Sequence, residues 1–457
     1  MNIIHAKYMP MTQKIKFRFA PSPTGKVHIG NVRTAIITWI AARSMDGEFM
    51  LRIDDTDETR SKDEFTEALK VDLKWLGLNW DDYAHQRDRW DRYDELIQKL
   101  KDDGRLYPCF ETPEQLELKR KSLLNRGLPP IYDRAALDLT EEQKAKYEAE
   151  GRKPHWRFKM NHTPIVWQDL VRGEVKFDGA AMSDPVLIRE DGRPLYHLCS
   201  VIDDIDFKIS HITRGEDHVS NTASHVQMFE ALGATPPQFA HLPLISDADG
   251  GKLSKRLGSL SIEELRENEG IEPMAIISLL ARLGTSDPIE AFTDKQPLID
   301  TFDFAKFGRG TPKMDVREIE RLNARIVHTL PYETVKDRPA LQGVDEKFWN
   351  NVKANLSKVS DVTDWMHITQ DTIKAEVDDA DKDYIALAAQ TLPEGEINDG
   401  TWGEWTSVLK EKSGRKGKEL FMPLRQALTG MSHGPEMDKM IILLGRDRVL
   451  RRLQRTV

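Results

Sequence analysis

A strand, a tight loop and a helix follow one another near the start of the chain, and this segment constrains the fold more than any other. Apolar and basic residues alternate over 15–19, which is typical of a strand with one buried face. The loop Pro-Ser-Pro-Thr-Gly at 21–25 follows, and apolar residues then recur at helical spacing over 32–40. Residues 48–53 return to an extended pattern, and 61–76 again indicate a helix. This order predicts a parallel α/β sheet.

Several residues predict where helices begin and end. Residues 61–64 form a capping-box pattern, and Gly77 is expected just beyond the end of the helix that they open. Thr112, followed by a proline, should cap another helix. Ser220 is expected to cap a helix that ends at Gly233.

The regular alternation of strands and helices breaks in the middle of the chain. Residues 155–198 indicate strands and turns, among them a strand at 171–177 and a hairpin at Asp191-Gly192. Residues 210–213 are again strand-like, and after about residue 330 nearly every segment has a helical pattern. This order predicts an α/β unit that is interrupted by an inserted module, then resumed, and followed by a helical tail.

Length and composition limit the class of protein. A chain of 457 residues predicts two to four domains, and 39% of hydrophobic residues allows a core in each. No run of about 18 apolar residues occurs, so a membrane-spanning helix is not expected. Residues 1–13 lack the apolar segment of a secretory signal and are interpreted as a disordered extension or as an over-long start of the sequence. Cys109 and Cys199 follow no disulfide spacing, which favours a cytoplasmic location.

The distribution of charge is more informative than its sum. A net charge of −9 argues against a nucleic-acid binder when the chain is taken whole. However, residues 371–400 hold nine acidic and two basic side chains, whereas 401–457 hold six acidic and twelve basic ones. A domain can present a basic face while the whole molecule stays acidic. On charge alone, a solvated helical surface remains an equal alternative.

The strand-to-helix loop within residues 18–31 has the chemistry of a nucleotide site. A helix N-terminus carries free N–H groups and a partial positive charge, which suit phosphate. His28 at that point can donate to phosphate oxygens, and Gly30 leaves the backbone bare, so that a flat base could lie against it. The prolines stiffen the loop and limit the entropy lost on binding. For a His-x-Gly pattern alone, a structural turn with an incidental histidine is the alternative.

A second candidate segment, residues 247–256, places three cations and a hydroxyl group in a glycine-led loop. Lys252, Lys255 and Arg256 supply the cations, and Ser254 supplies the hydroxyl. Adenylyl transfer depends mostly on positioning and charge stabilisation, and mobile lysines can follow the charge as pyrophosphate leaves. Taken alone, such a run is more often a solvated loop, and its weight comes from the first motif upstream.

Together the two segments resemble the two signatures of class I aminoacyl-tRNA synthetases, known as HIGH and KMSKS. They stand here as His-Ile-Gly-Asn at 28–31 and Lys-Leu-Ser-Lys-Arg at 252–256. Further segments resemble the bacterial glutamyl-tRNA synthetase family in the right order: 18–25, 52–57, 196–198, 214–218 and 420–425. The resemblance runs from about Ile15 to the end of the chain.

The resemblance implies a multidomain α/β plus all-α protein that activates L-glutamate with ATP and transfers it from glutamyl-adenylate to the 3′-terminal adenosine of tRNA(Glu). It implies a Rossmann-type parallel sheet that is split by an acceptor-end-binding module. A stem-contact domain and a helical anticodon-binding domain follow. The boundaries are expected at 1–13 for the extension, 14–93 and 200–245 for the two Rossmann halves, 94–199 for the inserted module, 246–331 for the stem-contact domain and 332–457 for the anticodon-binding domain.

The resemblance also implies a glutamate site. Arg18 and Arg214 match the family's glutamate-binding arginines, and a planar guanidinium can grip a carboxylate through two hydrogen bonds. We assign Arg18 to the side-chain carboxylate, a pairing that would reject glutamine because its neutral amide leaves the arginine unmatched. Ala20 and Ser22 should line the same loop, and Tyr196 should contact the substrate from the exit strand of the insert.

Two positions of this site depart from the family pattern. The carboxylate expected to hold the substrate ammonium group falls at Asp54, where the family more often has glutamate. Because aspartate is one methylene shorter, a bridging water is an alternative to direct contact. A salt-bridge cluster is the structural alternative for Asp54 and Asp55. Ser200 stands where many members have asparagine.

For ATP, the resemblance implies a set of residues around the base and the phosphates: His28, Gly30, Asp217, Lys252, Ser254 and Lys255. Catalysis is expected to rest on His28, Gly30, Lys252 and Lys255. No general base is needed, because the substrate carboxylate is already an anion and Mg²⁺ arrives with ATP. The rate should come from in-line placement and from stabilisation of charge as pyrophosphate departs.

Some family members bind zinc in the insert through two pairs of cysteines. In this chain only Cys109 remains, Glu111 takes the neighbouring ligand position, and residues 132–136 contain no thiol. A tetrahedral zinc site is therefore not expected, and no structural metal is predicted.

Four other functions are weighed against this one. Glutaminyl-tRNA synthetases tend to show Pro-Pro-Glu-Pro before the first signature, where this chain has Ala-Pro-Ser-Pro at 20–23. A truncated paralogue that glutamylates a modified base in tRNA lacks the helical tail. A small-molecule nucleotidyltransferase would not need so long a tail, and a non-catalytic tRNA-binding scaffold would not need His28 and Lys255. Whether tRNA(Gln) is charged as well stays open, and a monomer is expected because the family is usually monomeric.

Overall fold

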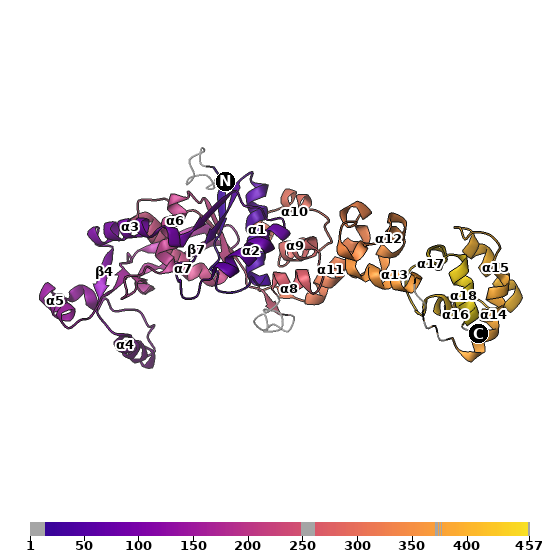
Figure 1. Ribbon diagram of the computed structural model, residues 1–457. Helices are drawn as coiled ribbons and strands as arrows, with labels where there is room; N and C mark the ends of the chain where they lie inside the picture. Colours follow the sequence, from indigo (N-terminus) through magenta and orange to yellow (C-terminus); the bar gives the residue numbers. More distant parts are fainter. Residues whose placement is uncertain (1–13, 248–260, 371–372, 374, 376, 456–457) are drawn as a thin grey trace, which may run out of the picture. The chain divides into compact units, whose positions relative to one another are not determined.

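The computed structural model describes residues 14–247, 261–370, 373, 375 and 377–455. It forms two compact units (Figure 1). The first comprises Met1–Asn268, Ile277–Glu290 and Asp294–Val316, and the second comprises Glu269–Ile276, Ala291–Thr293 and Arg317–Val457. The expected extension at 1–13 and the signature at 252–256 lie outside the described residues.

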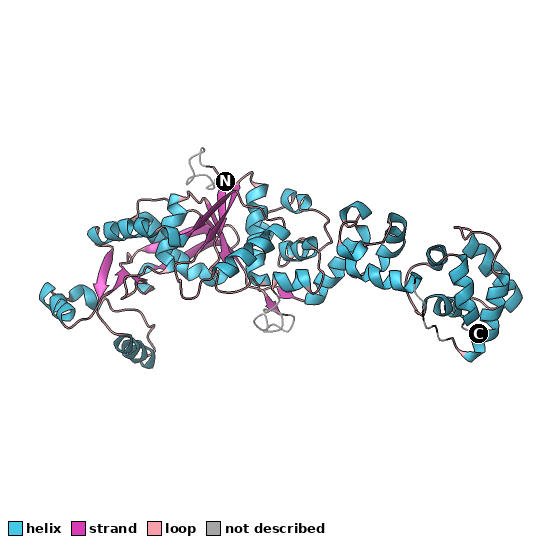
Figure 2. Ribbon diagram, in the orientation of Figure 1, coloured by secondary structure: helices cyan, strands magenta, loops and turns pink. Residues whose placement is uncertain are grey.

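A seven-stranded sheet forms the centre of the first unit (Figure 2). Its order is β3-β2-β1-β9-β10-β6-β7, and every neighbouring pair is parallel except β6 and β7. The strands are β1 Lys16–Phe19, β2 Glu48–Ile53, β3 Asp82–His85, β6 Pro164–Asp169, β7 Gly173–Asp178, β9 His211–Gly215 and β10 Gln238–Leu242. The predicted parallel α/β sheet is therefore confirmed.

Helices cover the central strands, which explains why β2 is buried along almost its whole length. Helix α1 packs against β1, β2 and β9. Helices α3, α6 and α7 share a hydrophobic core with Met50, Ile212 and Phe239 of the sheet. The bounds are α1 Ile29–Ser44, α2 Asp63–Trp75, α3 Trp90–Asp102, α6 Tyr196–Asp206 and α7 Val219–Ala231.

The predicted helix stops are confirmed, whereas two of the three predicted caps are wrong. Gly77 and Gly233 follow their helices with positive φ angles of 65° and 78°, and Thr112 forms a full capping box on α4. Ser61 makes no cap: α2 begins after Lys62, whose backbone N–H donates to Pro23 O at 3.1 Å, so that the proline loop fixes the helix entry instead.

The second incorrect cap is Ser220, which lies inside α7. A short 3₁₀ turn, η4 Glu216–His218, runs directly into that helix. The chain therefore enters α7 already wound, and the first turn needs no hydroxyl cap at position 220.

The inserted module has its own small antiparallel sheet of order β4-β5-β8. Its elements are β4 Leu106–Cys109, α4 Pro113–Asn125, α5 Glu141–Ala149, β5 His155–Phe158 and β8 Val186–Ile188. Helices α4 and α5 bury no residue and lie at the end of the module away from the main sheet (Figure 1). Strands β6 and β7 also fall within 94–199, yet they extend the main sheet. The sequence indicated β7 and did not indicate β6.

The chain beyond the main sheet is mostly helical. Strand β11 Ser246–Asp247 pairs in parallel with β12 Lys313–Met314, and α8 Ile262–Glu267 and α10 Gln296–Asp300 belong to the same unit. Helices α9 Pro273–Arg282 and α11 Val316–Thr329 are each divided between the two units. Among the described residues, no helix is long and apolar enough to cross a membrane.

The second unit is helical around one hydrophobic core that includes the fully buried side chains Trp349 and Trp405. Its helices are α12 Glu346–Val352, α13 Val362–Gln370, α14 Lys382–Thr391, α15 Thr401–Ser413, α16 Lys418–Thr429, α17 Met437–Leu444 and α18 Arg446–Arg455. The described residues from 332 onward contain no strand, so the predicted helical tail is confirmed.

Candidate active site

The candidate site lies where the strand order of the main sheet reverses. From β1 the chain passes through α1 to β2 on one side, and β9 lies on the other side of β1. Crevices at such switch points, at the carboxyl ends of the strands, are where α/β sheets bind ligands. Arg18 on β1 and Arg214 on β9 lie near these ends, and Asp54 directly follows β2.

The loop after β1 is fixed by backbone hydrogen bonds to the segment after β2. The N–H of Asp54 donates to Pro21 O at 3.0 Å, and the N–H of Lys62 donates to Pro23 O at 3.1 Å. The predicted residues Ala20 and Ser22 lie in this loop, where Ala20 is partly buried and Ser22 is exposed. The prolines therefore stiffen the loop, and their carbonyl groups also hold it in position.

His28 is the N-cap of α1, directly after this loop. Its Nδ1 accepts a hydrogen bond from the N–H of Gly30 at 3.2 Å. Partial burial lowers the pKa of His28, so the ring is neutral at pH 7 and carries its proton on Nε2. The helix N-terminus and the Nε2–H group are both donors, as a phosphate site requires.

The described residues that follow the second signature lie beside the N-terminus of α1. Strand β11 ends at Asp247, and the described chain resumes at Ser261, which forms an antiparallel bridge with His28. The N–H of Ile262 donates to Val27 O at 3.2 Å, and Ser261 caps α8. Lys252, Ser254 and Lys255 lie outside the described residues, but the chain that follows them is held beside His28.

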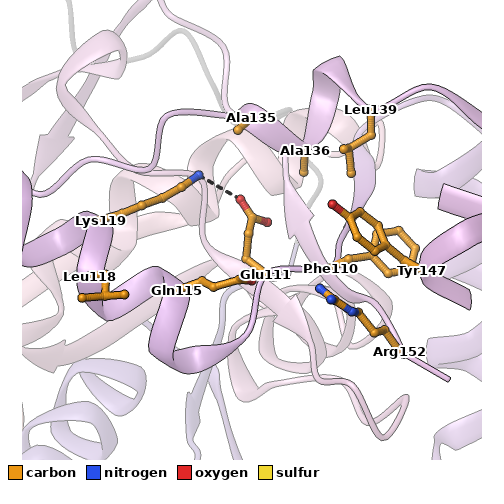
Figure 3. A pocket seen from close by; sticks show the side chains of 10 residues that line it. All are labelled: Phe110, Glu111, Gln115, Leu118, Lys119, Ala135, Ala136, Leu139, Tyr147 and Arg152. Atoms are coloured by element: carbon orange, nitrogen blue, oxygen red, sulfur yellow. Dashed lines mark hydrogen bonds and ion pairs between the residues drawn. The ribbon is translucent and has the colours of Figure 1, made fainter. Parts of the chain in front are cut away.

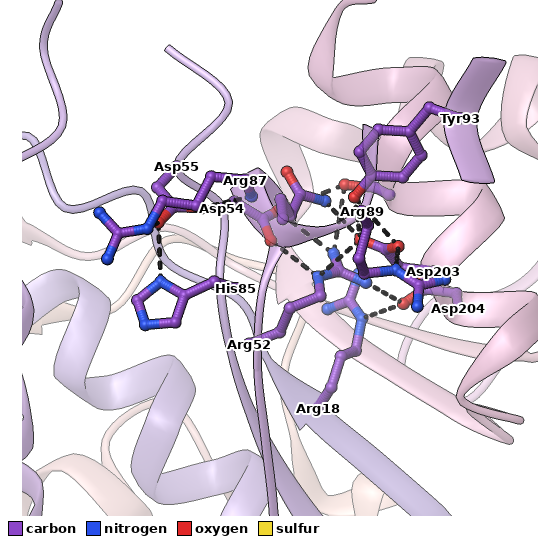
Figure 4. Close-up of polar contacts among 12 residues, drawn as sticks. Arg18, Arg52, Asp54, Asp55, His85, Arg87, Arg89, Tyr93, Asp203 and Asp204 are labelled. Atoms are coloured by element: carbon purple, nitrogen blue, oxygen red, sulfur yellow. Dashed lines mark hydrogen bonds and ion pairs between the residues drawn. The ribbon is translucent and has the colours of Figure 1, made fainter. Parts of the chain in front are cut away.

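Arg18 and Asp54 meet in a buried network that centres on Arg52 (Figure 4). Arg18 contacts Asp204 through Nε at 3.1 Å and Nη2 at 3.4 Å, and Arg52 contacts the same carboxylate through Nη1 at 2.8 Å. Arg52 also binds Asp54 through Nε at 2.7 Å and donates to Ser200 Oγ at 3.2 Å, while Ser200 donates to Asp54 at 3.3 Å. Thus Arg18, Asp54 and Ser200 are brought together by two residues that sequence reasoning did not assign to the site.

The network continues away from the site and anchors helix α6. Asp203, fully buried, accepts from Arg89 Nε at 2.7 Å, Gln86 Nε2 at 2.8 Å and Tyr93 Oη at 2.9 Å. Gln86 belongs to the 3₁₀ turn η1 Gln86–Asp88, Tyr93 belongs to α3, and Arg89 lies between these two elements. Because breaking one partner of a buried ion pair costs about 3–5 kcal/mol, α6 presents Asp204 and Ser200 to the site from a fixed position.

Asp54 and Asp55, adjacent in sequence, belong to different networks. Asp55 accepts from His85 Nδ1 at 2.7 Å and from the N–H of Arg87 at 3.0 Å (Figure 4). Burial raises the pKa of Asp54, and the Arg52 guanidinium opposes that shift. The salt-bridge alternative considered for both carboxylates therefore describes real contacts, although only Asp54 shares its network with Arg18.

Arg214 is buried, with 8% of its surface exposed, and it is surrounded by neutral groups. It donates to Thr222 Oγ1 at 2.6 Å, His225 Nδ1 at 3.3 Å and His241 Nε2 at 3.3 Å. Within the described part of the chain, no carboxylate forms an ion pair with Arg214. Burial and the nearby charge of Arg18 lower its pKa to about 10, so it remains a cation at pH 7. Sequence reasoning identified Arg214 but none of these three partners.

Tyr196 and Asp217 lie on the elements that flank Arg214. Tyr196 begins α6, and its hydroxyl accepts from Asn221 Nδ2 at 2.9 Å. Its ring centroid is 4.0 Å from that of His197. Asp217 is exposed in the turn that follows β9. The predicted exit strand at 196 is therefore the first turn of a helix.

Figure 3 shows Glu111 among the residues that line a pocket of the inserted module. Both Cys109 and Glu111 have protein partners, and the hydroxyl of Tyr132 lies 3.8 Å from Cys109 Sγ. Burial raises the pKa of Cys109 to about 12, which keeps the thiol protonated. Glu111 accepts from Tyr132 Oη at 2.9 Å and Lys119 Nζ at 3.1 Å, beside a pocket of about 380 Å³. No cluster of three or more potential metal ligands occurs among the described residues.

The absence of zinc remains a prediction that metal analysis can check. Zinc binding needs a thiolate, whereas burial keeps Cys109 as a thiol and Glu111 is already paired with Lys119. Chelator-washed protein should contain far less than one zinc per chain by atomic emission, and stoichiometric zinc would refute the prediction.

Comparisons with family models and known proteins show what this chain is similar to. Residues 14–321 match the model of the tRNA synthetases class I (E and Q), catalytic domain, and residues 344–457 match an anticodon binding domain. The glutamate–tRNA ligase of Azospirillum brasilense is 54% identical over 95% of this chain and 98% of its own length. Glutamate–tRNA ligase 1 of Maricaulis maris is 51% identical over 96% of this chain and 98% of its own length.

Solved structures show the same likeness. The crystal structure of a glutamate tRNA ligase from Elizabethkingia meningosepticum, in complex with its amino acid, has a TM-score of 0.86 and 27% identity over 97% of this chain and 99% of that one. The glutamate–tRNA synthetase from Elizabethkingia anophelis has a TM-score of 0.84 at the same identity and coverage. The expected resemblance is confirmed: the chain belongs to the class I aminoacyl-tRNA synthetases, in the family of the glutamate and glutamine enzymes, with bacterial glutamate–tRNA ligases as its relatives.

Proposed function

We propose that this protein is a glutamate–tRNA ligase that forms glutamyl-adenylate from L-glutamate and ATP and then esterifies the 3′-terminal adenosine of tRNA(Glu). Relatives of that name are 54% and 51% identical over nearly the full length of the chain. The observation that carries the proposal is Arg214, a buried cation at the switch point of the sheet whose protein partners are neutral. Such a group needs an anion, and the side-chain carboxylate of glutamate supplies one.

The two arginines divide the work in the glutamate site. Arg18 uses Nε and Nη2 on Asp204, so we expect only Nη1 to face the substrate, whereas Arg214 brings an unneutralised charge. Both guanidinium groups together would hold the side-chain carboxylate, with Arg214 contributing the larger attraction. Glutamine would leave Arg214 buried without an anion, which disfavours it.

The remaining glutamate contacts follow from the neighbours of Arg52. Asp54 would hold the ammonium group, directly or through water, with Ser200 orienting the carboxylate by the hydrogen bond between them. Ala20, Ser22 and Tyr196 would line the site from the loop after β1 and the start of α6.

ATP would lie along the N-terminus of α1. His28 Nε2–H and the N-terminal N–H groups of the helix would donate to the phosphates, Gly30 would let the base approach, and Asp217 would contact the ribose or the base. Lys252, Ser254 and Lys255 would meet the phosphates, which is consistent with the bridge between Ser261 and His28. The charge of the departing pyrophosphate would be stabilised by these lysines, together with the Mg²⁺ that accompanies ATP as a substrate.

The remaining parts of the chain would bind tRNA. We assign 14–93 and 200–245 to the catalytic halves, 94–199 to acceptor-end binding, 246–331 to stem contact and 332–457 to the anticodon, the last supported by the family match at 344–457. We propose that the enzyme acts as a monomer in the cytoplasm, where its substrates are. Charging of tRNA(Gln) in addition to tRNA(Glu) remains the second candidate activity.

Aminoacylation with purified components tests the proposal. The wild-type protein, ATP, Mg²⁺ and tRNA(Glu) should attach radiolabelled glutamate to the tRNA and should not attach glutamine. Attachment of glutamine instead would make the chain a glutaminyl-tRNA synthetase. A parallel reaction with tRNA(Gln) decides the tRNA specificity.

A further inference from the structure

The partners of Arg214 form a chain that ends at a buried carboxylate. Asp169, at the end of β6, is 4% exposed, and its Oδ2 lies 2.5 Å from Nδ1 of His241. His241 lies on β10, directly opposite Arg214 in the parallel pairing of β9 and β10. An acidic side chain therefore stands one imidazole ring away from the cation.

The position of the Asp169 carboxylate is fixed by the backbone. Its Oδ1 accepts three N–H groups, from Arg172 at 3.0 Å, Val171 at 3.1 Å and His241 at 3.2 Å. Three such donors can be satisfied only by an oxygen that accepts. Oδ2 is left to face the histidine.

This arrangement fixes which nitrogen of His241 carries the proton. The carboxylate can only accept, so Nδ1 of His241 must be the donor. Burial lowers the pKa of His241, in spite of the opposing effect of Asp169, and the ring is neutral. Its Nε2 is therefore a bare acceptor, which receives Arg214 Nε at 3.3 Å and lies 2.7 Å from Thr222 Oγ1.

A second histidine follows the same rule on the other edge of the guanidinium. Nδ1 of His225 accepts from Arg214 Nη1, so its Nε2 carries the proton and donates to His197 Nδ1 at 2.9 Å. All three nitrogens of Arg214 thus meet neutral acceptors. These contacts orient the guanidinium but do not cancel its charge. A carboxylate in direct contact would cancel that charge.

We propose that Asp169 and His241 are positioning residues for glutamate selection: they fix the imidazole tautomer that aims the guanidinium of Arg214 at the substrate carboxylate. This inference rests on the proposed function. A direct Asp–Arg pair would satisfy Arg214 and compete with the substrate. The interposed neutral ring instead holds Arg214 in place and leaves its charge for glutamate.

The decisive variant is Asp169→Asn, which changes neither volume nor shape. The three backbone donors keep the amide oxygen on their side, so the amide NH₂ must face Nδ1 of His241. The ring then has to carry its proton on Nε2, which places an N–H against Nε–H of Arg214. Orientation of Arg214 should be lost while the fold is kept.

The measurement is ATP–pyrophosphate exchange in the presence of tRNA(Glu), with glutamate and ATP varied separately. For D169N we expect the KM for glutamate to rise about tenfold or more, while the KM for ATP is unchanged and kcat falls less than about threefold. H241F should behave similarly, and H241Q, which can still offer an acceptor near Nε2, should recover part of the loss.

His211→Phe is the matched control. His211 is a buried histidine on β9 of the same sheet, and its ring stacks on Phe17 with centroids 4.6 Å apart. It does not contact Arg214, so H211F should keep the wild-type KM for glutamate.

Several outcomes would overturn the inference. These are wild-type glutamate kinetics in D169N, an equal loss for glutamate and ATP, or a collapse of D169N in thermal unfolding, because each indicates a purely structural role. If the wild-type protein itself shows no glutamate-dependent exchange, the proposed function fails, and that result is distinguishable because it does not depend on any variant.

Discussion

At the scale of the residue, the two arginines of the proposed glutamate site differ in what surrounds them. Arg18 forms an ion pair with Asp204, so the charge of Arg18 is largely balanced inside the protein. Asp204 also binds Arg52. Arg214 is surrounded by Thr222 and two neutral histidines. Burial of a cation without an anion costs free energy, and a bound substrate carboxylate would offset that cost. The affinity for glutamate should therefore depend on the neighbours of each arginine as well as on the arginines themselves.

Substitution of each arginine by glutamine should separate binding from stability. Both Arg18→Gln and Arg214→Gln should abolish measurable glutamate use in pyrophosphate exchange. R18Q should also lower the free energy of unfolding, by about 1–3 kcal/mol, because Asp204 loses the two N–H donors of Arg18. R214Q leaves no carboxylate unpaired, so its stability should be close to that of the wild type. Unchanged glutamate kinetics in R18Q would exclude it from the site, and urea denaturation measures the stability difference.

The pH dependence of stability should reveal the buried histidine His211. Burial lowers its pKa to about 4, below the value near 6.5 of an unfolded chain. The folded state therefore binds the proton more weakly, and the stability from the neutral ring is complete above about pH 6.5 and lost as the pH falls toward 4. Between pH 7 and pH 5, H211F should lose about 2 kcal/mol less than the wild type in urea denaturation.

The exposed His162 provides the control for this measurement. H162F should retain the pH slope of the wild type. If H211F also retains that slope, His211 is not a buried neutral group whose protonation opposes folding.

At the scale of the element, the proposed function gives His28 at the start of α1 both a structural and a chemical task. His28 caps the helix through Nδ1, and this leaves the Nε2–H group at the helix N-terminus. The proline loop before it is fastened to the segments that lead out of β2 and into α2. The described chain returns beside His28 at Ser261. Three separate segments of the sequence thus converge on one helix end.

Two substitutions of His28 should separate these tasks. His28→Ala removes both the cap and the ring donor, whereas His28→Asn restores a good cap without the ring. Both variants should reduce adenylate formation about a hundredfold. Only H28A should lose stability, by about 1 kcal/mol in thermal unfolding, and both should still bind tRNA. Loss of tRNA binding in parallel with activity would indicate misfolding rather than a missing donor.

At the scale of the whole molecule, the chain combines a split α/β unit with a helical unit. The first contains the switch point of the main sheet, and the second carries the match to an anticodon binding domain at 344–457. Its most basic described helix is α18, which carries five arginines within Arg446–Arg455. The net charge of −9 therefore hides a local concentration of basic residues at the end of the chain that carries the anticodon-domain match.

The family resemblance leads us to expect that activation depends on tRNA. Pyrophosphate exchange with glutamate and ATP should be detectable only when tRNA(Glu) is added. A tRNA of unrelated specificity serves as the control and should not restore exchange. Full exchange without any tRNA would contradict this expectation, and it would favour a small-molecule nucleotidyltransferase or an enzyme that activates glutamate by itself.

The sequence by itself determined the α/β class, the interruption and the helical tail, because these follow from local periodicity and turn residues. Segments that resemble the family predicted Arg18, His28 and Arg214 as site residues. The sequence did not predict that positions 61 and 220 make no cap, because the path of the backbone before each helix decides where the helix begins. It also did not predict β6.

The tertiary structure alone decided which charges are balanced. Asp204 forms an ion pair with Arg18, 186 residues earlier in the sequence. Asp169 is connected to Arg214 only through His241, which lies 72 residues after Asp169. No local pattern encodes such pairings, because they depend on which strands lie side by side. The identities of the charged groups are written in the chain, but their protonation states and orientations arise from burial and from neighbours that only the folded sheet brings together.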